Sequence, residues 1–408
     1  MKRIIALVLA FVLLLSLAAC SNGSTPETTE KEKVKTDVAE PLTWEKINAL
    51  PIANDSMTED ELRKLCLDYM YLQLTFAWTP SQELTYNNAG SNVDFIPGKV
   101  YGGTPYDNGS YGNLYTVMEM YDSENGMMDF SKGEYTLKRI ANQCSSACCW
   151  GWGRVANSLE NVGATDSSEA NGYLRLGNYT YDTTQKDLKG MTTNAVCVAN
   201  GVNVMYEAYA LLKPADGLIT ANATNGHVRM TSSKATVVRD ADNKINGDQS
   251  YVTYVDQGRA WWTSTQSNGI PYEIQGGVDV KVTFNDLFKS GYIPVTIAEF
   301  NKQKPVDKSV TTISVSGDSV TVAQLKRATI TSNYWLSDVT VTITDPNGKE
   351  LLRTNTPCFI DDKCKEIASS VVLGHSLPDY ADGKNKIEIK VRISTGEQPV
   401  VYSGILNK

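Results

Sequence analysis

The spacing of apolar residues in the first half of the chain predicts helices. Within residues 57–78, apolar side chains recur at the three- and four-residue spacing of a single helix face. Thr58 and Glu61 form a capping-box pattern, which fixes the start of this helix. Residues 143–162 and 194–212 predict two further helices, although internal glycines weaken the first of them.

Between and beyond these helices the pattern changes. Residues 86–114 are rich in Gly, Asn, Tyr and Pro and predict a long loop, a type of segment that is often functional. Farther along, short runs rich in β-branched residues alternate with turn residues and predict strands. These runs are residues 227–238, 249–257, 278–284 and 294–300. Because the helices come first and the strands follow, residues 42–304 are expected to form an α+β domain.

The last part of the chain, residues 305–408, alternates apolar and polar residues between turns that contain Asp, Asn, Gly and Pro. This pattern predicts an all-β sandwich of about 100 residues. Cys358 and Cys364 are close enough in sequence to form a small disulfide loop, provided that the protein lies outside the cytoplasm. No catalytic constellation is visible here, so we interpret this part as a spacer or a binding module.

The chain begins with Lys2 and Arg3, an apolar run over residues 4–15, and small residues before Cys20, which is typical of a secretory signal peptide over residues 1–20. The Leu-Ala-Ala-Cys ending also resembles a bacterial lipobox, in which Cys20 becomes the lipidated first residue; an ordinary signal peptide is the alternative. Residues 21–41 contain few apolar side chains and are expected to form a disordered tether. We therefore expect a lipid-anchored protein that faces the extracytoplasmic side of the membrane.

Composition narrows the possible partners. Hydrophobic residues make up 41% of the chain and charged residues 21%, as in ordinary globular proteins. The net charge of −8 argues against a nucleic-acid partner. After residue 20 no apolar run is long enough to span a bilayer.

Three of the eight cysteines lie within the stretch Asn-Gln-Cys-Ser-Ser-Ala-Cys-Cys. Their spacing is not that of a zinc site and the chain has only two histidines, so no metal is expected. Cys148 and Cys149 fit the role of small buried hydrophobes. Cys144 stands at the start of the predicted helix, where unpaired N–H groups and the helix dipole favour a thiolate. The amides of Cys144 and Ser145 are candidates for stabilising an oxyanion.

A thiolate nucleophile needs a base, and His227 lies where a turn-rich segment enters a predicted strand. His375 belongs to the predicted sandwich and is expected at the surface. The next strand ends in Asp256-Gln257, and either residue can orient the imidazole. We choose Asp256 as the orienting residue and keep Gln257 as the alternative.

The order of these motifs resembles the CHAP and NlpC-type papain-like cysteine amidohydrolases over about residues 95–300. The matching features are Cys144-Ser145-Ser146 before an aromatic helix, Lys-Pro-Ala-Asp-Gly before a strand that opens Gly-His-Val, and a later strand ending Asp-Gln. The resemblance implies a papain-like fold, in which helices precede an antiparallel sheet, with Cys144 as nucleophile, His227 as base and Asp256 as orienter. This chain departs from the family pattern in Pro214-Ala215-Asp216, which replaces Pro-Gly-Asp, and in its long spacing from His227 to Asp256.

Aromatic residues are candidates for the wall of a substrate cleft. Tyr101 and Tyr106 flank two glycines, which would let a peptide backbone approach closely. Trp150, Trp152 and the pair Trp261-Trp262 are further candidates, for which core packing is the preferred interpretation.

Together these features predict a membrane-anchored cysteine hydrolase that cleaves amide bonds through a thiol acyl-enzyme, without a cofactor. The resemblance implies peptidoglycan or a related peptide as substrate. One alternative is a non-catalytic surface lipoprotein that binds cell wall or another ligand. A second alternative is an enzyme that transfers the acyl group to an amine.

Overall fold

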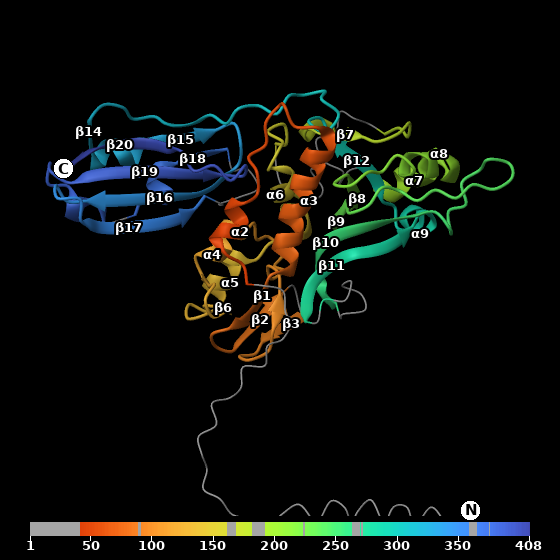
Figure 1. Cartoon of the computed structure of the whole chain (residues 1–408), viewed down its shortest axis with the longest axis horizontal. Coiled ribbons are helices and arrows are strands. Elements are labelled where there is room, and N and C mark those ends of the chain that lie inside the picture. The colour runs from red at the N-terminus through yellow and green to blue at the C-terminus, as the bar shows by residue number, and fades with distance from the viewer. Residues whose placement is uncertain are drawn as a thin grey trace, which may run out of the picture. The chain divides into compact units, whose positions relative to one another are not determined.

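The computed structural model describes residues 41–88, 91–160, 169–181, 192–222, 225–262, 270, 272–358, 365–374 and 376–408. The expected signal peptide, the lipidation site Cys20, nearly all of the tether, Cys364, His375 and the side chains of Trp261-Trp262 lie outside this description. Ala39–Lys408 form one compact unit. The fold is α+β, as predicted (Figure 1).

A ten-stranded sheet occupies the first part of this unit, within the residues described. In spatial order its strands are β5 (Tyr121–Asp122), β6 (Met127–Met128), β1 (Ala77–Pro80), β4 (Tyr101–Gly102), β11 (Glu273–Thr283), β10 (Tyr251–Trp262), β9 (Gly226–Thr231), β8 (Gly217–Ala221), β12 (Ile293–Ile297) and β7 (Tyr173–Arg175). The central strands β11, β10, β9, β8, β12 and β7 pair antiparallel. The four predicted strand runs therefore belong to one sheet, in which β11, β10 and β9 are neighbours and β8 separates β9 from β12.

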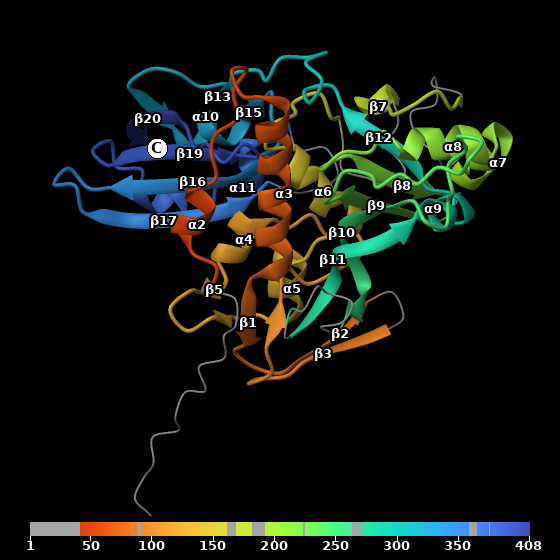
Figure 2. The ribbon, with the colours of Figure 1, turned by 45° about the vertical axis from the view of Figure 1, so that its right-hand side comes forward.

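The helices of this part surround the sheet. They are α2 (Trp44–Asn48), α3 (Glu59–Thr75), α4 (Leu114–Met118), α5 (Glu134–Ile140), α6 (Cys144–Trp152), α7 (Thr193–Asn200), α8 (Val202–Tyr209) and α9 (Phe284–Lys289). Helices α3 and α6 lie side by side, and α6 packs on β9 and β10 (Figures 1 and 2). Helix α6 thus lies against the strands that carry His227 and Asp256.

Four predictions from the helix and loop patterns can be compared with these bounds. The capping box of Thr58 and Glu61 is present at the start of α3, as predicted. The helix predicted over 143–162 is wrong in length, because α6 ends at Trp152 and its C-cap, Gly153, packs against Trp335. A Cβ at residue 153 would lie 2.9 Å from that indole, so this glycine permits the close contact.

The helix predicted over 194–212 is interrupted at Gly201, whose φ of +79° suits glycine and separates α7 from α8. The long loop predicted over 86–114 contains part of a hairpin. Its strands are β2 (Leu84–Asn88) and β3 (Ser91–Phe95), and in it Tyr86 faces Val93.

The C-terminal part contains two sheets. One has the order β13 (Thr311–Ile313), β15 (Thr329–Ser332) and β18 (Glu366–Ala368). The other has the order β14 (Ser319–Thr321), β20 (Val400–Asn407), β19 (Lys386–Ile393), β16 (Leu336–Thr344) and β17 (Glu350–Pro357). Side chains of both sheets, with those of α10 (Val322–Arg327) and α11 (Ser369–Val372), share one hydrophobic core.

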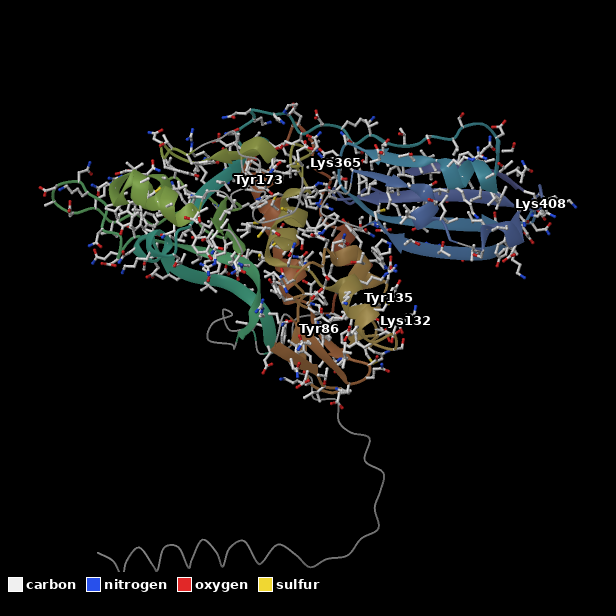
Figure 3. All side chains as sticks on the ribbon, turned by 180° about the vertical axis from the view of Figure 1, so that it is seen from behind. Tyr86, Lys132, Tyr135, Tyr173, Lys365 and Lys408 are labelled. Atoms are coloured by element: carbon white, nitrogen blue, oxygen red, sulfur yellow. The ribbon has the colours of Figure 1, made fainter. Side chains whose placement is uncertain are left out.

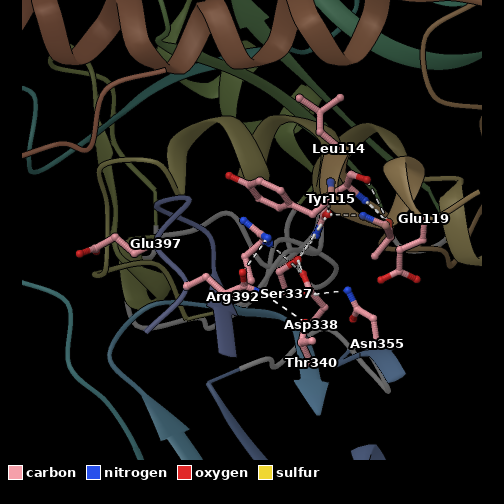
Figure 4. Close-up of polar contacts among 12 residues, drawn as sticks. Leu114, Tyr115, Glu119, Ser337, Asp338, Thr340, Asn355, Arg392 and Glu397 are labelled. Carbon is pink, nitrogen blue, oxygen red and sulfur yellow. Dashed lines mark hydrogen bonds and ion pairs between the residues drawn. The ribbon is translucent and has the colours of Figure 1, made fainter. Parts of the chain in front are cut away.

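Polar and aromatic contacts join the C-terminal sheets to the α+β part. The Nδ2 atom of Asn113, the N-cap of α4, donates to Ser337 Oγ at 3.1 Å. The guanidinium of Arg392 lies 4.7 Å from the ring centroid of Tyr115, and its Nε atom lies 3.5 Å from Asp338 Oδ2 (Figure 4). Since Asn113, Ser337 and Asp338 are buried, this contact fixes α4 against β16.

Among the helices of the described ranges, none is both long and apolar enough to cross a membrane.

Candidate active site

Helix α6 presents Cys144 at its first residue. The N-cap Gln143 is held by its own N–H, which donates to Ser146 Oγ at 3.0 Å, and by its carbonyl, which accepts from Ala147 N at 2.9 Å. Cys144 is 5% exposed, and its Sγ lies 4.0 Å from the carbonyl oxygen of Gly226 at the start of β9. The helix start and the strand start therefore meet at the thiol.

His227 and Asp256 are brought together by the pairing of β9 with β10. Tyr254 pairs with Thr231 and Val255 with Met230, and continuing this antiparallel register places Asp256 opposite Arg229. His227 and Arg229 share one face of β9, because side chains two residues apart point the same way. His227 Nε2 lies 2.7 Å from Asp256 Oδ2. Asp256 Oδ1 accepts from the N–H of Gly277 at 2.8 Å, which fixes the carboxylate from the other side.

A local irregularity of the neighbouring strand lies beside Asp256. Between Tyr254 and Asp256 the pairing of β10 with β11 shifts by one residue, so that β11 carries an extra residue in this region. Asp279, with φ of +53°, lies in the bulged segment, and its Oδ1 accepts from Tyr71 Oη at 2.6 Å. Bulges commonly re-aim side chains next to active sites.

The electrostatics separate Cys144 from its neighbours. Burial alone would raise the pKa of Cys144, but the charge and hydrogen bond of His227, aided by the Val228 backbone, outweigh it and lower the pKa. For His227, burial would lower the pKa, but the Cys144 charge and the hydrogen bond to Asp256 raise it to about 10. These opposite shifts favour a thiolate–imidazolium pair over a neutral pair.

The imidazole has a defined orientation. With Nε2 directed at Asp256, Nδ1 is the ring nitrogen left to contact the Cys144 thiol. The His227 side chain is 26% exposed and that of Asp256 is 5% exposed, so the dyad reaches solvent on the histidine side. Burial would raise the pKa of Asp256, but its bond to His227 and the nearby Arg229 charge lower it.

Arg229 is a site residue that the sequence reasoning missed. Its Nε lies 3.3 Å from Asp256 Oδ2, the same oxygen that His227 contacts. Its guanidinium lies 4.1 Å from the ring centroid of Tyr254 and 4.6 Å from that of Tyr292. The i, i+2 spacing from His227 on a strand was the available signal.

The remaining cysteines of the cluster are core residues, as predicted. Cys148 and Cys149 are fully buried. Burial raises the pKa of Cys148 well above its usual value and that of Cys149 to about 12. Cys149 Sγ contacts Tyr173 Oη at 3.0 Å, and Cys148 Sγ lies 3.9 Å from the Val228 carbonyl. Cys144 therefore differs from both in its contacts and in the direction of its pKa shift.

The alternative orienter, Gln257, points away from His227. Its Nε2 donates to the Thr104 carbonyl at 2.7 Å, and its side chain is fully buried. Adjacent residues of a strand face opposite sides of the sheet, which explains why Asp256 and Gln257 cannot both reach the imidazole.

Of the two tyrosines predicted to contact substrate, Tyr101 lies in the core and Tyr106 is half-buried. The expectation that Tyr101 lines a cleft is wrong, because this residue is fully buried and packs against Trp78 and Phe95. Its hydroxyl donates to the Asp94 carbonyl at 3.0 Å. The apolar surroundings of β4 thus make it a core residue.

Tyr106 is half-buried and lies near the thiol. Burial raises the pKa of Tyr106 to about 12, with a further contribution from the Cys144 charge and an opposing one from Arg259. Its backbone N–H donates to Gln275 Oε1 at 2.9 Å. Tyr106 therefore remains a candidate for contact with a substrate.

Ser145 is buried in the first turn of α6, beside Cys144. The first N–H groups of a helix have no partner within the helix and can face a negatively charged oxygen. Trp150 and Trp152 are buried, in line with the preferred interpretation of them as core residues.

The described residues contain no group of three or more His, Cys, Asp or Glu side chains arranged to hold a metal ion. Comparison of the chain with protein-family models, curated proteins and solved structures finds no match in any of the three.

Proposed function

We propose that this chain is a cysteine hydrolase of papain-like architecture that cleaves amide bonds. The observation that supports the proposal is the constellation of Cys144, His227 and Asp256, in which the pKa of the thiol is lowered while that of the imidazole is raised. The chemistry requires a nucleophile and a base within reach of each other. Here the candidate nucleophile begins a helix that packs on the strand bearing the candidate base.

In the proposed reaction, the Cys144 thiolate attacks the carbonyl carbon of the substrate. The negative charge on the carbonyl oxygen is stabilised by the amides of Cys144 and Ser145. The His227 imidazolium gives its proton to the departing amine, and an acyl-thioester remains on Cys144. Neutral His227 then takes a proton from water, and the resulting hydroxide attacks the thioester. The C–S bond breaks, the acid leaves, and the Cys144 thiolate and His227 imidazolium are restored. Asp256 keeps Nε2–H engaged throughout, so that Nδ1 remains the nitrogen that exchanges the proton.

The substrate proposed is the peptide part of peptidoglycan or a related peptide. Within the α+β fold, we propose a papain-like domain over residues 42–304 and a β-sandwich over residues 305–408. The localisation proposed is the outer face of a membrane, through a lipid on Cys20. A non-catalytic binding lipoprotein, and acyl transfer to an amine rather than to water, are the competing functions.

The proposal is tested by incubating the unit Ala39–Lys408 with purified peptidoglycan, beside a Cys144→Ala variant. We expect new amino and carboxyl termini in the soluble products with the parent only, identified by mass spectrometry. Release by neither protein contradicts hydrolysis of this substrate. Adducts that form only when an amine is added would indicate transfer instead of hydrolysis.

A further inference from the structure

A groove of about 580 Å³ lies where the α+β part meets the C-terminal sheets. From the α+β part it is lined by Asp107, Asn108, Gly109, Ser110, Tyr111, Tyr135, Lys138 and Arg139. From the C-terminal part it is lined by Thr356, Pro357 and Val371. A volume of this size accommodates several residues of an extended ligand.

The groove adjoins the nucleophile through two segments of chain. Gly109, in its wall, donates its N–H to Gln143 Oε1 at 3.2 Å, and Gln143 is the residue before Cys144. Asp107, also in its wall, donates its N–H to the Asn142 carbonyl at 3.0 Å and follows Tyr106, which interacts electrostatically with Cys144. The loop of residues 106–109 therefore runs from the neighbourhood of Cys144 to the wall of the groove.

The charges of the groove favour an acidic ligand. Asp107 is buried, and its two carboxylate oxygens accept from Tyr86 Oη and Ser110 Oγ, so it is directed into its own loop. Arg139 is bound to the Glu119 carboxylate and to the Asn355 carbonyl. Lys138 differs, because its Nζ has one distant ion-pair partner, Glu134 Oε2, at 4.0 Å, and both side chains are exposed. An exposed pair of this length contributes little, so the ammonium can bind a carboxylate of a ligand.

Apolar surface contributed by both parts accompanies this cation. Tyr135 is 58% exposed and Val371 is 53% exposed, and both line the groove. Figure 3 shows Tyr135 near Lys132, on the side of the molecule turned away from the viewer in Figure 1. Exposed apolar residues that gather beside convergent polar groups are typical of binding sites.

We propose that this groove is a remote substrate subsite that binds the carboxylate-bearing end of an extended acidic peptide, with Lys138 contacting the carboxylate. The proposal rests on the proposed function, because it makes the groove a continuation of the site at Cys144. It gives the C-terminal part a direct role in recognition, through Val371 and Pro357.

The test measures peptide binding in the full unit Ala39–Lys408 carrying Cys144→Ala, so that no peptide is consumed. The probes are a fluorescent pentapeptide with two free carboxylates, its amidated counterpart and an unlabelled glycan chain without peptide. Lys138→Gln is expected to weaken binding of the acidic peptide about threefold, as expected for an exposed ion pair. Val371→Asp is expected to weaken it about tenfold through like-charge repulsion. The amidated peptide should not respond to Lys138→Gln.

Two matched variants control for changes in surface charge and polarity. Lys132→Gln removes an exposed lysine that does not line the groove, and Val310→Asp alters a valine that is 58% exposed in the C-terminal part. Both should bind the acidic peptide as the parent does. The proposal is overturned if the groove variants bind as tightly as these controls, if no saturable binding occurs, or if the glycan chain displaces the peptide.

The experiments distinguish an error in the groove proposal from an error in the proposed hydrolase function. The groove proposal alone would be overturned by one combination of results. In that combination Cys144 is alkylated selectively and peptidoglycan is cleaved, but peptide binding does not depend on Lys138 or Val371. Peptide binding that depends on Lys138, while the chain with Cys144 intact cleaves no peptidoglycan, would keep the groove as an acidic-peptide site but overturn the hydrolase and with it the role of the groove as a substrate subsite.

Discussion

His227 Nε2 lies 2.7 Å from Asp256 Oδ2, although 29 residues separate the two along the chain. The antiparallel pairing of β9 and β10 makes this contact possible, and on the other side of β10 the β11 strand carries a bulge beside Asp256. The hydrogen bond orients the imidazole and, together with the Cys144 charge, raises the pKa of His227. The chemistry at Cys144 depends on the exact register of three strands.

The pH dependence of alkylation should distinguish Cys144 from the other cysteines. Because the His227 charge and hydrogen bond lower the pKa of Cys144 despite its burial, the thiolate persists below the pKa of an ordinary thiol. We expect iodoacetamide to modify Cys144 selectively near pH ~7, where an ordinary thiol of pKa about 8.5 reacts slowly. Cys148 and Cys149 should remain unmodified, since burial raises their pKa values. Peptide mapping by mass spectrometry at a series of pH values provides the measurement.

The matched variant for this experiment is His227→Gln. Without the imidazolium, burial is left as the dominant influence and the pKa of Cys144 should rise. At a pH below the pKa of Cys144 in both the parent and the variant, alkylation should slow about tenfold for each unit by which the pKa rises. Equal rates in the two proteins, or equal labelling of Cys148, would contradict the ion pair.

Replacing Asp256 with Asn should move the basic limit of activity. The His227 pKa of about 10 depends in part on the Asp256 hydrogen bond and charge, so the neutral amide should lower it. The protonated imidazole is populated below its pKa and lost above it, and the basic limb of kcat/KM should therefore shift to lower pH. We also expect kcat to fall by about 10²- to 10⁴-fold, the range found when an orienting carboxylate is lost. Asp242→Asn, at an exposed turn, is the control, and an unchanged basic limb would argue against this role for Asp256.

The residues of the candidate site were largely predictable because their chemistry is carried by residue type and local setting. A cysteine at a helix start, a histidine entering a strand and an acid on the next strand are local features, and the structure brings Cys144, His227 and Asp256 together. The prediction that this strand ends at Asp256-Gln257 is wrong, because β10 continues to Trp262. The choice between Asp256 and Gln257 required knowledge of which strand face meets the imidazole. Alternation alone does not provide this, because the bulge on β11 shifts the register nearby.

Other features depend on tertiary packing that no local pattern contains. Helix α6 ends at Trp152, and the next residue, Gly153, is approached closely by Trp335 from a distant part of the sequence. Tyr101 became a core residue through its contacts with Trp78 and Phe95, which belong to separate strands. Aromatic residues in a glycine-rich segment predict either a cleft wall or a core, and only the packing distinguishes the two.

Arg229 should act as a positioning residue for Asp256. Its charge helps to lower the pKa of that carboxyl, and its guanidinium stacks on Tyr254 and Tyr292. Arg229→Met should therefore raise the pKa of Asp256. A carboxylate whose pKa is lowered on folding stabilises the protein above its unfolded pKa, and this contribution is lost as the pH falls through the folded pKa. Because Asp256 in the variant takes up its proton at a higher pH, the acid limb of kcat/KM should move to higher pH as well.

The same substitution should lower the free energy of unfolding at pH 7 by about 1–3 kcal/mol, through the lost hydrogen bond and cation–π contacts, as measured with urea. Compared with Arg229→Met, Arg229→Lys should restore the position of the acid limb more fully than the free energy of unfolding. The reason is that an ammonium replaces the charge but not the planar stacking. An acid limb that is identical in all three proteins would mean that Arg229 has a structural role only.

Gly276 on β11 should be indispensable to the position of Asp256. It pairs with Gln257, its φ is +157°, and a Cβ at this residue would lie 2.2 Å from the Asp256 carbonyl oxygen. That oxygen belongs to the backbone and cannot rotate aside, so Gly276→Ala must push β10 away from β11 beside the catalytic carboxylate. We expect a loss of at least about 2 kcal/mol in the free energy of unfolding, within the range for strained backbone positions. Alkylation of Cys144 near neutral pH should slow as well, because displacement of Asp256 weakens the His227 cation.

Gly258 provides the matched control for this prediction. It lies on β10 two residues after Asp256, and a Cβ there would meet no atom within 4 Å. Gly258→Ala should therefore leave Cys144 alkylation unchanged and alter the free energy of unfolding by no more than about 0.5 kcal/mol. Both variants add one methyl group to the same pair of strands, so a difference between them isolates the close approach at residue 276 from the general effect of replacing a strand glycine. If the two variants behave alike in urea denaturation and in alkylation, the carbonyl of Asp256 does not lie against Gly276, and the register of β10 on β11 beside Asp256 is wrong.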